Sequence, residues 1–521
     1  MRFLPLWLVV GGLFACAHVI HSLPRVELGY EIHEAIFFDE RPSVVKSSHH
    51  RKLADTITFP TSVSVSLRKA DRFDAPLKPL TNRSTVNKGD KGAICPQAFP
   101  IWYLRMLAEL KHDTDALKKA EDDPTSLIPP PDPREQEDCL FLDVLVPEEV
   151  LQNRYNESYR GAPVMVWLYG GGFTFTDDSG NPAGLIAASK ESSAGSDGVI
   201  YVKINYRGGA FGFLSGPEIQ SNGTANAGLL DQRLALEWVQ EHIRQFGGDP
   251  DRVTLFGQSA GAASILHKIT AYGGARGPVR KLPFRSLVVV NSKLVAASRY
   301  GQFTFAPSVD CSFVPALPGQ LLFDKNLSIM TGHNAHETIF FIDPNSTTDA
   351  DFRKNLKASL PAIQESIVDY VSETLYPPPG NRSAAIGYTT AAGRNELSSS
   401  EVSFTCNTNY LAQDFSAINP LTFAYQFSIP PAYHGEDVAY VYYNGPSPQV
   451  INTTNAHALQ TYYTQFAITG QPNEVGFPDF RPYGSGKQIL DLNVTGMSMM
   501  DDPTNNPRCH WWQLALYFKI S

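Results

Sequence analysis

Short apolar runs recur along the chain and alternate with segments of helical periodicity. Runs with almost no polar positions are typical of strands buried on both faces of a sheet. They lie at residues 164–169, 199–205, 253–256, 286–291 and 421–428. Residues 226–246 carry an apolar stripe at helical spacing, made by Leu229, Leu230, Leu234, Leu236, Trp238, Val239 and Ile243. The alternation predicts an α/β fold with a large, mostly parallel central sheet flanked by helices.

No internal repeat or coiled-coil pattern interrupts this alternation. The proline-rich stretches at residues 129–133 and 377–380 have the length of stiff loops rather than interdomain linkers. We therefore expect one large domain over residues 18–521, preceded by a signal peptide at residues 1–17.

The first residues have the pattern of a secretory signal. Met1 and Arg2 are followed by an apolar stretch at residues 3–14 and by the small-x-small sequence of residues 15–17. A membrane anchor is the alternative, but Pro5, Gly11 and Gly12 interrupt the stretch. No later run has the length needed to span a bilayer. The sequence predicts a secreted protein without a stable membrane span.

Composition narrows the function classes. The chain has 521 residues, a net charge of −9 and 43% hydrophobic residues, which excludes a disordered chain. It has no basic run and no zinc-ligand spacing, so nucleic acid is not an expected partner. Eight glycosylation sequons begin at Asn82, Asn156, Asn222, Asn326, Asn345, Asn381, Asn452 and Asn493. Removing Cys16 with the signal leaves five of the six cysteines, so at most two disulfides form.

A candidate nucleophile lies in the segment 252–264. A strand-like run leads into the sequence Gly257-Gln-Ser259-Ala-Gly261, and a helix rich in small residues follows. This strand–turn–helix context is the one that a nucleophile elbow requires, with the serine hydroxyl exposed on a strained turn. A chance Gly-x-Ser-x-Gly match is the alternative. The amide of Ala260 would open the helix and face developing negative charge.

A second strand end supplies a candidate oxyanion hole. The apolar run 164–169 leads directly into Gly170, Gly171 and Gly172. Backbone amides of Gly171 and Gly172 can converge with that of Ala260 on an oxyanion. The alternatives are a flexible turn and a phosphate-binding loop, but the sequence lacks the Gly-Lys-Ser/Thr or Gly-x-Gly-x-x-Gly pattern that phosphate binding needs.

Four longer segments resemble the type-B carboxylesterases, the cholinesterase and fungal lipase group of the α/β-hydrolase fold. Residues 246–261 (Phe-Gly-Gly-Asp-Pro-Asp-Arg-Val-Thr-Leu-Phe-Gly-Gln-Ser-Ala-Gly) and 137–143 (Glu-Asp-Cys-Leu-Phe-Leu-Asp) match the two signatures of that family. Residues 205–214 and 228–238 also match, and residues 269–274 look like the fungal branch. The resemblance extends from about Cys95 to the C-terminus.

The resemblance implies the remaining members of a catalytic triad. The segment 332–341 matches the stretch that carries the family's acid, placing it on Glu337. The dipeptide His434-Gly435 follows a predicted strand and matches the position of the base. An imidazole there can take the serine proton and return it to the leaving alcohol, with a carboxylate orienting it. From the residues alone, Asp310 is a competing acid.

The resemblance also implies structural pairs. It pairs Cys95 with Cys139 and Cys406 with Cys509, which leaves Cys311 as the odd thiol. It further implies two buried ion pairs, Arg72 with Glu137 and Arg207 with Asp231. We expect neither metal nor organic cofactor: His333 and His336 flank Glu337 but lack a ligand set, and His267 is expected to pack or cap.

Three departures from the family pattern stand out. Residues 18–94 are atypical, above all 47–69. Of the motif expected in this region, only the Arg-Phe-x-x-Pro end remains, at residues 72–76. Near residues 291–293 a longer helical segment of the family is missing. His336 and Thr338 replace the usual Asp and Gly beside the acid.

The sequence therefore predicts a secreted serine hydrolase that cleaves small-molecule or lipid esters of carboxylic acids through an acyl-enzyme. A non-catalytic binding protein, or a defective member of the fold, is the alternative.

Overall fold

The computed structural model describes residues 24–37, 56–61, 73–79, 93–176, 180–274, 295–316 and 327–514, with the short pieces 81, 83–84, 86–87, 318 and 321. Several predictions concern residues outside this part: the signal peptide, the strand at 286–291, the shortened junction at 291–293, and the positions Arg72, Asn82 and Asn326. The atypical segment 47–69 is described only at residues 56–61.

A six-stranded sheet holds most of the predicted strands. Its order is β3-β4-β6-β8-β7-β9. Strand β7 pairs in parallel with β8 and β9, whereas β3, β4 and β6 form an antiparallel side of the sheet next to β8. The bounds are β3 Ile36–Phe37, β4 Thr56–Thr61, β6 Leu142–Pro147, β7 Ala162–Leu168, β8 Ile200–Ile204 and β9 Gly248–Gly257. Three of the predicted apolar runs are thus strands of one sheet.

A four-stranded sheet carries the C-terminal part of the chain, in the order β10-β11-β12-β13. Strands β10, β11 and β12 run parallel and β13 is antiparallel. The bounds are β10 Ile329–Asn334, β11 Thr422–Phe427, β12 Gln488–Asn493 and β13 Gly496–Asp501. Asn334 lies opposite Phe427, so β10 and β11 end at the same sheet edge. A small third sheet contains β1 Arg25–Glu27, β2 Ile32–Glu34 and β5 Val86–Asn87.

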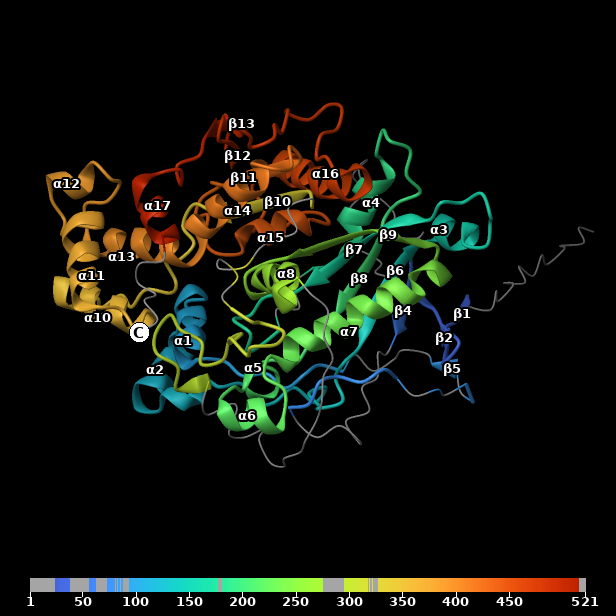
Figure 1. Cartoon of the computed structure of the whole chain (residues 1–521), viewed down its shortest axis with the longest axis horizontal. Coiled ribbons are helices and arrows are strands. Elements are labelled where there is room, and N and C mark those ends of the chain that lie inside the picture. The colour runs from blue at the N-terminus through green and yellow to red at the C-terminus, as the bar shows by residue number, and fades with distance from the viewer. Residues whose placement is uncertain are drawn as a thin grey trace, which may run out of the picture.

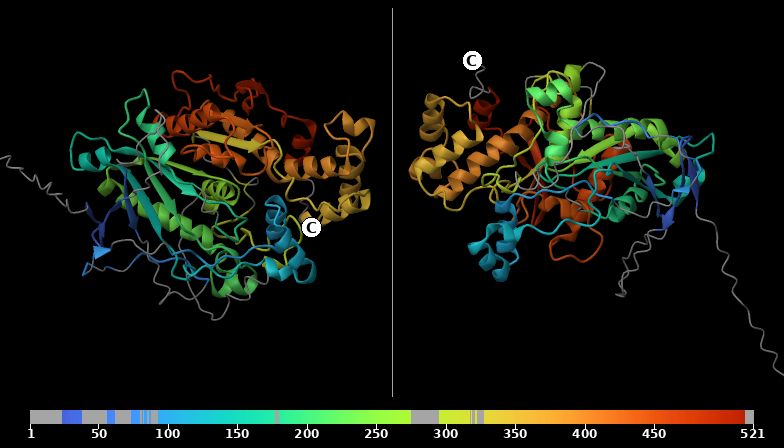
Figure 2. Two further views of the ribbon diagram at one scale, coloured as in Figure 1. Left: turned by 180° about the vertical axis from the view of Figure 1, so that it is seen from behind. Right: turned by 90° about the horizontal axis from the view of Figure 1, so that it is seen from below.

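Helices cover both faces of the six-stranded sheet (Figures 1 and 2). Strand β7 shows why, because all seven of its residues are buried and successive side chains point to opposite faces. Met165 and Trp167 belong to the apolar cluster that contains residues of α4 and α16. Val164 and Val166 belong to the cluster formed with α7. A strand packed on both faces needs the near-continuous apolar run seen in the sequence.

The helices follow the predicted alternation. The predicted helix at 226–246 is α7 with a 3₁₀ turn, Ile243–Phe246, and it ends at Gly247, whose φ is 88°. The bounds are α1 Ile101–Leu110, α2 Thr114–Asp122, α3 Glu148–Asn153, α4 Ala183–Lys190, α5 Gly209–Phe213, α6 Pro217–Asn222, α7 Ala227–His242, α8 Ala260–Ile269, α10 Asp349–Ser359, α11 Glu365–Tyr370, α12 Asn381–Ala384, α13 Ala391–Ser400, α14 Cys406–Ser416, α15 Glu436–Val441, α16 Thr453–Thr469 and α17 Pro507–Gln513.

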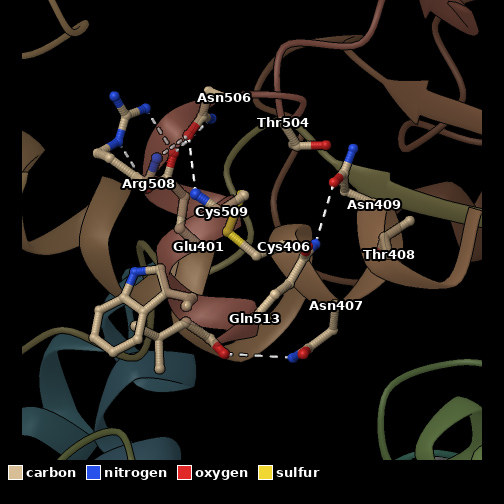
Figure 3. Close-up of a disulfide and its surroundings, with 12 residues drawn as sticks. Glu401, Cys406, Asn407, Thr408, Asn409, Thr504, Asn506, Arg508, Cys509 and Gln513 are labelled. Carbon is tan, nitrogen blue, oxygen red and sulfur yellow. Dashed lines mark hydrogen bonds and ion pairs between the residues drawn. A yellow bond between two sulfur atoms is a disulfide. The ribbon is translucent and has the colours of Figure 1, made fainter. Parts of the chain in front are cut away.

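Helices α10 to α13 lie together at one end of the molecule, drawn in gold in Figure 1. Their core joins Phe352 and Tyr376 to α14 and α17 through the disulfide of Cys406 and Cys509. Beside that bridge, Arg508 makes two hydrogen bonds to the buried carboxylate of Glu401 (Figure 3). A π-helical turn, Glu401–Thr405, leads into α14.

The structural pairs implied by the resemblance form where the structure describes them. Cys95 forms a disulfide with Cys139, and Cys406 forms one with Cys509. Cys311 is an exposed free thiol. Arg207 and Asp231 form a buried ion pair, with the guanidinium Nη2 lying 2.7 Å from the carboxylate Oδ1. The pair of Arg72 and Glu137 lies outside the described residues because Arg72 does.

Candidate active site

Ser259 lies at the junction between β9 and α8. Its backbone has φ 56° and ψ −124°, a strained conformation for a residue with a side chain. Strand β9 ends at Gly257 and α8 begins at Ala260, so the turn is as short as the sequence predicts. A strained serine at a strand-to-helix turn is the geometry of a nucleophile elbow.

Close packing explains the glycine after the turn. A Cβ at Gly261 would lie 1.9 Å from the carbonyl oxygen of Leu168, at the end of β7. No side chain fits at this distance, so α8 can pack against β7 only with glycine here. The small residues of the motif therefore bring the helix start, and with it the amide of Ala260, next to the glycines that follow β7.

Glu337 and His434 meet at the edge shared by β10 and β11. The His434 Nδ1 atom lies 2.5 Å from Oε2 of Glu337. The other carboxylate oxygen accepts a 2.7 Å hydrogen bond from the backbone amide of Asn334. Both side chains are largely buried, with exposed fractions of 14% for His434 and 6% for Glu337. This contact fixes the imidazole orientation and favours the tautomer with a proton on Nδ1.

Backbone hydrogen bonds join the two loops that carry these side chains. The amide of Ala335 donates to the carbonyl of Phe427, and that of His336 donates to Ala432. His336 and Tyr433 also form an isolated β-bridge. The replacements at His336 and Thr338 are accommodated: His336 points its ring toward Glu396, and the Thr338 hydroxyl donates to the Glu396 carbonyl. The acid therefore stays in place despite the altered neighbours.

Two further carboxylic acids, both half-buried, lie close to this pair. Burial raises the pKa of Asp437, as does the charge of Glu337, although a hydrogen bond from Tyr425 opposes the shift. Burial also raises the pKa of Glu396, whose partner is His336. Because neither acid contacts His434 Nδ1, Glu337 remains the carboxylate that orients the base.

His434 Nε2 faces the nucleophile turn but contacts a neighbour of Ser259. The amide nitrogen of Gln258 lies 3.0 Å from His434 Nε2. Ser259 and His434 line the same cavity, yet the hydrogen-bond partner of Nε2 is Gln258. The sequence motif marks Gln258 only as a variable position, so this contact could not be read from it.

The glycines after β7 and the start of α8 border one cavity of about 2460 Å³. Gly171, Gly172 and Ala260 line it together with Ser259 and His434. Among the described residues, no protein acceptor pairs with the amides of these two glycines or of Ala260. The six predicted catalytic and oxyanion-hole residues are thus brought together, with N–H groups available for an anion.

An aromatic wall runs along the cavity from the glycines to the base. Phe303 lies 6.3 Å from Phe175 and 6.4 Å from Phe341, measured between ring centroids. Phe341 and Phe404 contact the His434 ring at 5.3 and 4.7 Å. The π-helical turn places Phe404 here, and no sequence signal predicts that turn. Such a wall favours apolar ligands near the reacting groups.

The competing candidates have other roles. Both carboxylate oxygens of Asp310 are occupied, one by the Asn226 side chain and the other by the amides of Ser312 and Val314. His267 is mostly buried, and burial lowers its pKa to about 4. In the described part of the chain, no group of three His, Cys, Asp or Glu residues could hold a metal ion.

Gly171→Ala tests the predicted oxyanion hole: it is expected to lower kcat for the predicted ester hydrolysis by about 10²–10³-fold, as the loss of one oxyanion donor does. Gly171 has φ 104°, and an added Cβ would lie 2.1 Å from the carbonyl oxygen of Phe175, so the loop must move. Steady-state kinetics with a chromogenic ester measure the loss. Gly195→Ala is the matched control, because Gly195 has φ 70° but open space around it. Unchanged kcat in a folded Gly171→Ala protein would contradict the assignment.

Several known proteins are similar to this chain in sequence or in structure. The model of the carboxylesterase family matches residues 69–273 and 277–512. The carboxylesterase patB of Penicillium expansum is 37% identical over 559 residues, covering 95% of this chain and 96% of that protein. A secreted lipase of Arthroderma benhamiae is 30% identical, over 73% of this chain and 83% of the lipase. The crystal structure of Aspergillus niger EstA matches with a TM-score of 0.71 at 21% identity, over 95% and 98% of the two chains. The predicted α/β fold is confirmed.

Proposed function

Because the chain belongs to the carboxylesterase family and is a carboxylic ester hydrolase, we propose that Ser259, His434 and Glu337 are its catalytic triad. The contact between His434 and Glu337, on the cavity that Ser259 also lines, carries this proposal. The serine attacks the ester carbonyl carbon while His434 Nε2 takes its proton. The Glu337 carboxylate stabilises the imidazolium that forms.

The two halves of the reaction use the same groups. Collapse of the first tetrahedral intermediate releases the alcohol, which receives its proton from His434, and leaves an acyl group on Ser259. Water then attacks the acyl carbon, giving up a proton to His434. In both steps the amides of Gly171, Gly172 and Ala260 hold the negative oxygen. The residues present complete this cycle without a metal or an organic cofactor.

The cavity supports an ester with an apolar acyl or alcohol part as the substrate. Phe175, Phe303, Phe341 and Phe404 line the space between the oxyanion glycines and the base. Aromatic side chains contribute contact area to apolar acyl or alcohol groups.

Features of the described residues support export of the protein from the cell. Two disulfides form, as is usual in oxidising compartments. No helix in the described residues is long and apolar enough to cross a membrane. The sequon residues Asn156, Asn222, Asn345 and Asn381 are exposed, whereas Asn452 and Asn493 are half-buried. We propose that the protein is secreted and glycosylated at the exposed sites.

Covalent labelling tests the triad directly. The protein, expressed in a secretory host, is expected to react with a fluorophosphonate probe, and peptide mass spectrometry should place the adduct on Ser259. An excess of ester substrate should slow the labelling, and heat-denatured protein should not react. Labelling of another residue, or none in folded protein, would overturn the proposed function.

A further inference from the structure

The side chain of Gln258 occupies the hydrogen-bonding position at His434 Nε2 that Ser259 needs for proton transfer. His434 Nδ1 faces Glu337, so the lone pair of the neutral imidazole is on Nε2. The only side-chain nitrogen of Gln258 is an amide with two N–H donors, and it lies 3.0 Å from Nε2. The lone pair that must accept the Ser259 proton is therefore engaged by the preceding residue.

Packing holds the Gln258 side chain in this place. A Cβ at Gly170 would lie 2.8 Å from its Oε1 atom, and a Cβ at Gly435 would lie 3.2 Å from its Nε2 atom. Gln258 thus fits between the end of β7 and the loop of the base, where two glycines leave room. A side chain confined on both sides keeps its hydrogen bond at little entropic cost.

We propose that Gln258 is a positioning residue that holds neutral His434 in a resting arrangement and yields Nε2 to Ser259 when an ester binds. This inference rests on the proposed function. It has two consequences. Donation from Gln258 to Nε2 holds the neutral imidazole in one orientation. The same hydrogen bond must break before Ser259 can transfer its proton, so it slows the reaction.

Other charged groups face the base but do not replace this contact. Glu337 is hydrogen-bonded to His434 Nδ1. The Asp437 carboxyl in α15 lies close enough to interact electrostatically with both Glu337 and His434. Behind Glu337, Glu396 in α13 pairs with His336. These groups are unchanged by substitution at position 258, so a difference between variants reports the Gln258 contact.

The rate of fluorophosphonate inactivation between about pH 5 and pH 9 tests the proposal on the whole enzyme. Gln258→Met keeps the length of the side chain and removes the donor. We expect the midpoint of the acid limb to rise by about 0.4–1 pH unit and the alkaline plateau to rise about 2- to 10-fold, as loss of one hydrogen bond predicts. Gln258→Glu should move the midpoint further upward, because a carboxylate beside Nε2 favours the protonated imidazole.

The outcomes separate the inference from the proposed function. Variants whose midpoint and plateau match the natural enzyme would overturn the role of Gln258 and leave the triad intact. Failure of the natural enzyme to label at Ser259 at any pH would overturn the triad itself. If methionine disturbs folding, the Glu variant decides alone, because it has the size of Gln258. Gln240→Met and Gln240→Glu are matched controls on α7, where the Gln240 amide bonds the Pro250 carbonyl; their profiles should not move.

Discussion

Ser259→Ala is expected to lower kcat for ester hydrolysis by about 10⁶-fold, the effect of removing the nucleophile from a serine triad. The remaining rate would come from the oxyanion amides and from binding, which the substitution leaves in place. The fold should not suffer, because the hydroxyl has no structural hydrogen bond among the described residues. Turnover of a chromogenic ester by the purified variant measures the loss.

Two comparisons make the result specific. Ser221→Ala removes an exposed hydroxyl in α6 that donates to the Glu218 carbonyl, and it should leave kcat unchanged. KM of the Ser259→Ala variant should stay close to that of the natural enzyme if substrate binding is preserved. A loss of less than about tenfold in kcat would show that another group attacks the ester.

Asp231→Ala is expected to lower the free energy of unfolding by about 3–5 kcal/mol, because it leaves a buried guanidinium without its counter-ion. The Arg207 side chain is 4% exposed and that of Asp231 is 0% exposed. Arg207 makes a bidentate contact to this carboxylate and also donates to the Asp74 carbonyl. Denaturant unfolding, followed by circular dichroism, measures the change.

A second ion pair on the same helix is the control. In α7, the Arg233 Nε atom lies 2.9 Å from Oε1 of Glu237, but both side chains are partly exposed. Glu237→Ala should cost about 0.5 kcal/mol or less, as for exposed pairs at this spacing. A double variant, Arg207→Met with Asp231→Leu, should recover most of the stability lost in Asp231→Ala, because no charge is then buried alone. Equal losses for the buried and exposed pairs would contradict this reading of the core.

How much of the site can be predicted from the sequence depends on how far apart in the sequence the interacting residues lie. The turn at Ser259 is encoded within five residues, so the sequence predicts its position and conformation. Glu337 and Asp310 cannot be separated by local pattern, because the choice depends on which loop ends beside β11. The resemblance supplied that choice, and the register of β10 and β11 accounts for it.

Other parts had no sequence signal. The contact between Gln258 and His434 joins residues 176 positions apart through side chains alone. The hydrophobic periodicity of the sequence does not reveal the π-helical turn, Glu401–Thr405, that brings Phe404 to the base. The buried strands of the central sheet, by contrast, are fixed by their continuous apolar composition.

The proposed nucleophile and the proposed base reach the cavity from strands that are far apart in the sequence. Ser259 follows β9 of the six-stranded sheet, whereas Glu337 and His434 follow β10 and β11 of the four-stranded sheet. Backbone hydrogen bonds join the two loops that carry the acid and the base, so these two side chains are positioned together, whereas their alignment with Ser259 depends on contacts between distant parts of the chain. Proton transfer needs a hydrogen-bond distance of roughly 3 Å between serine and histidine. Helices and strands can keep their structure while this distance increases. The rate of ester hydrolysis therefore reports whether Ser259 and His434 are aligned. We expect partly opened forms of the protein to lose this activity while circular dichroism still shows native helix and strand content.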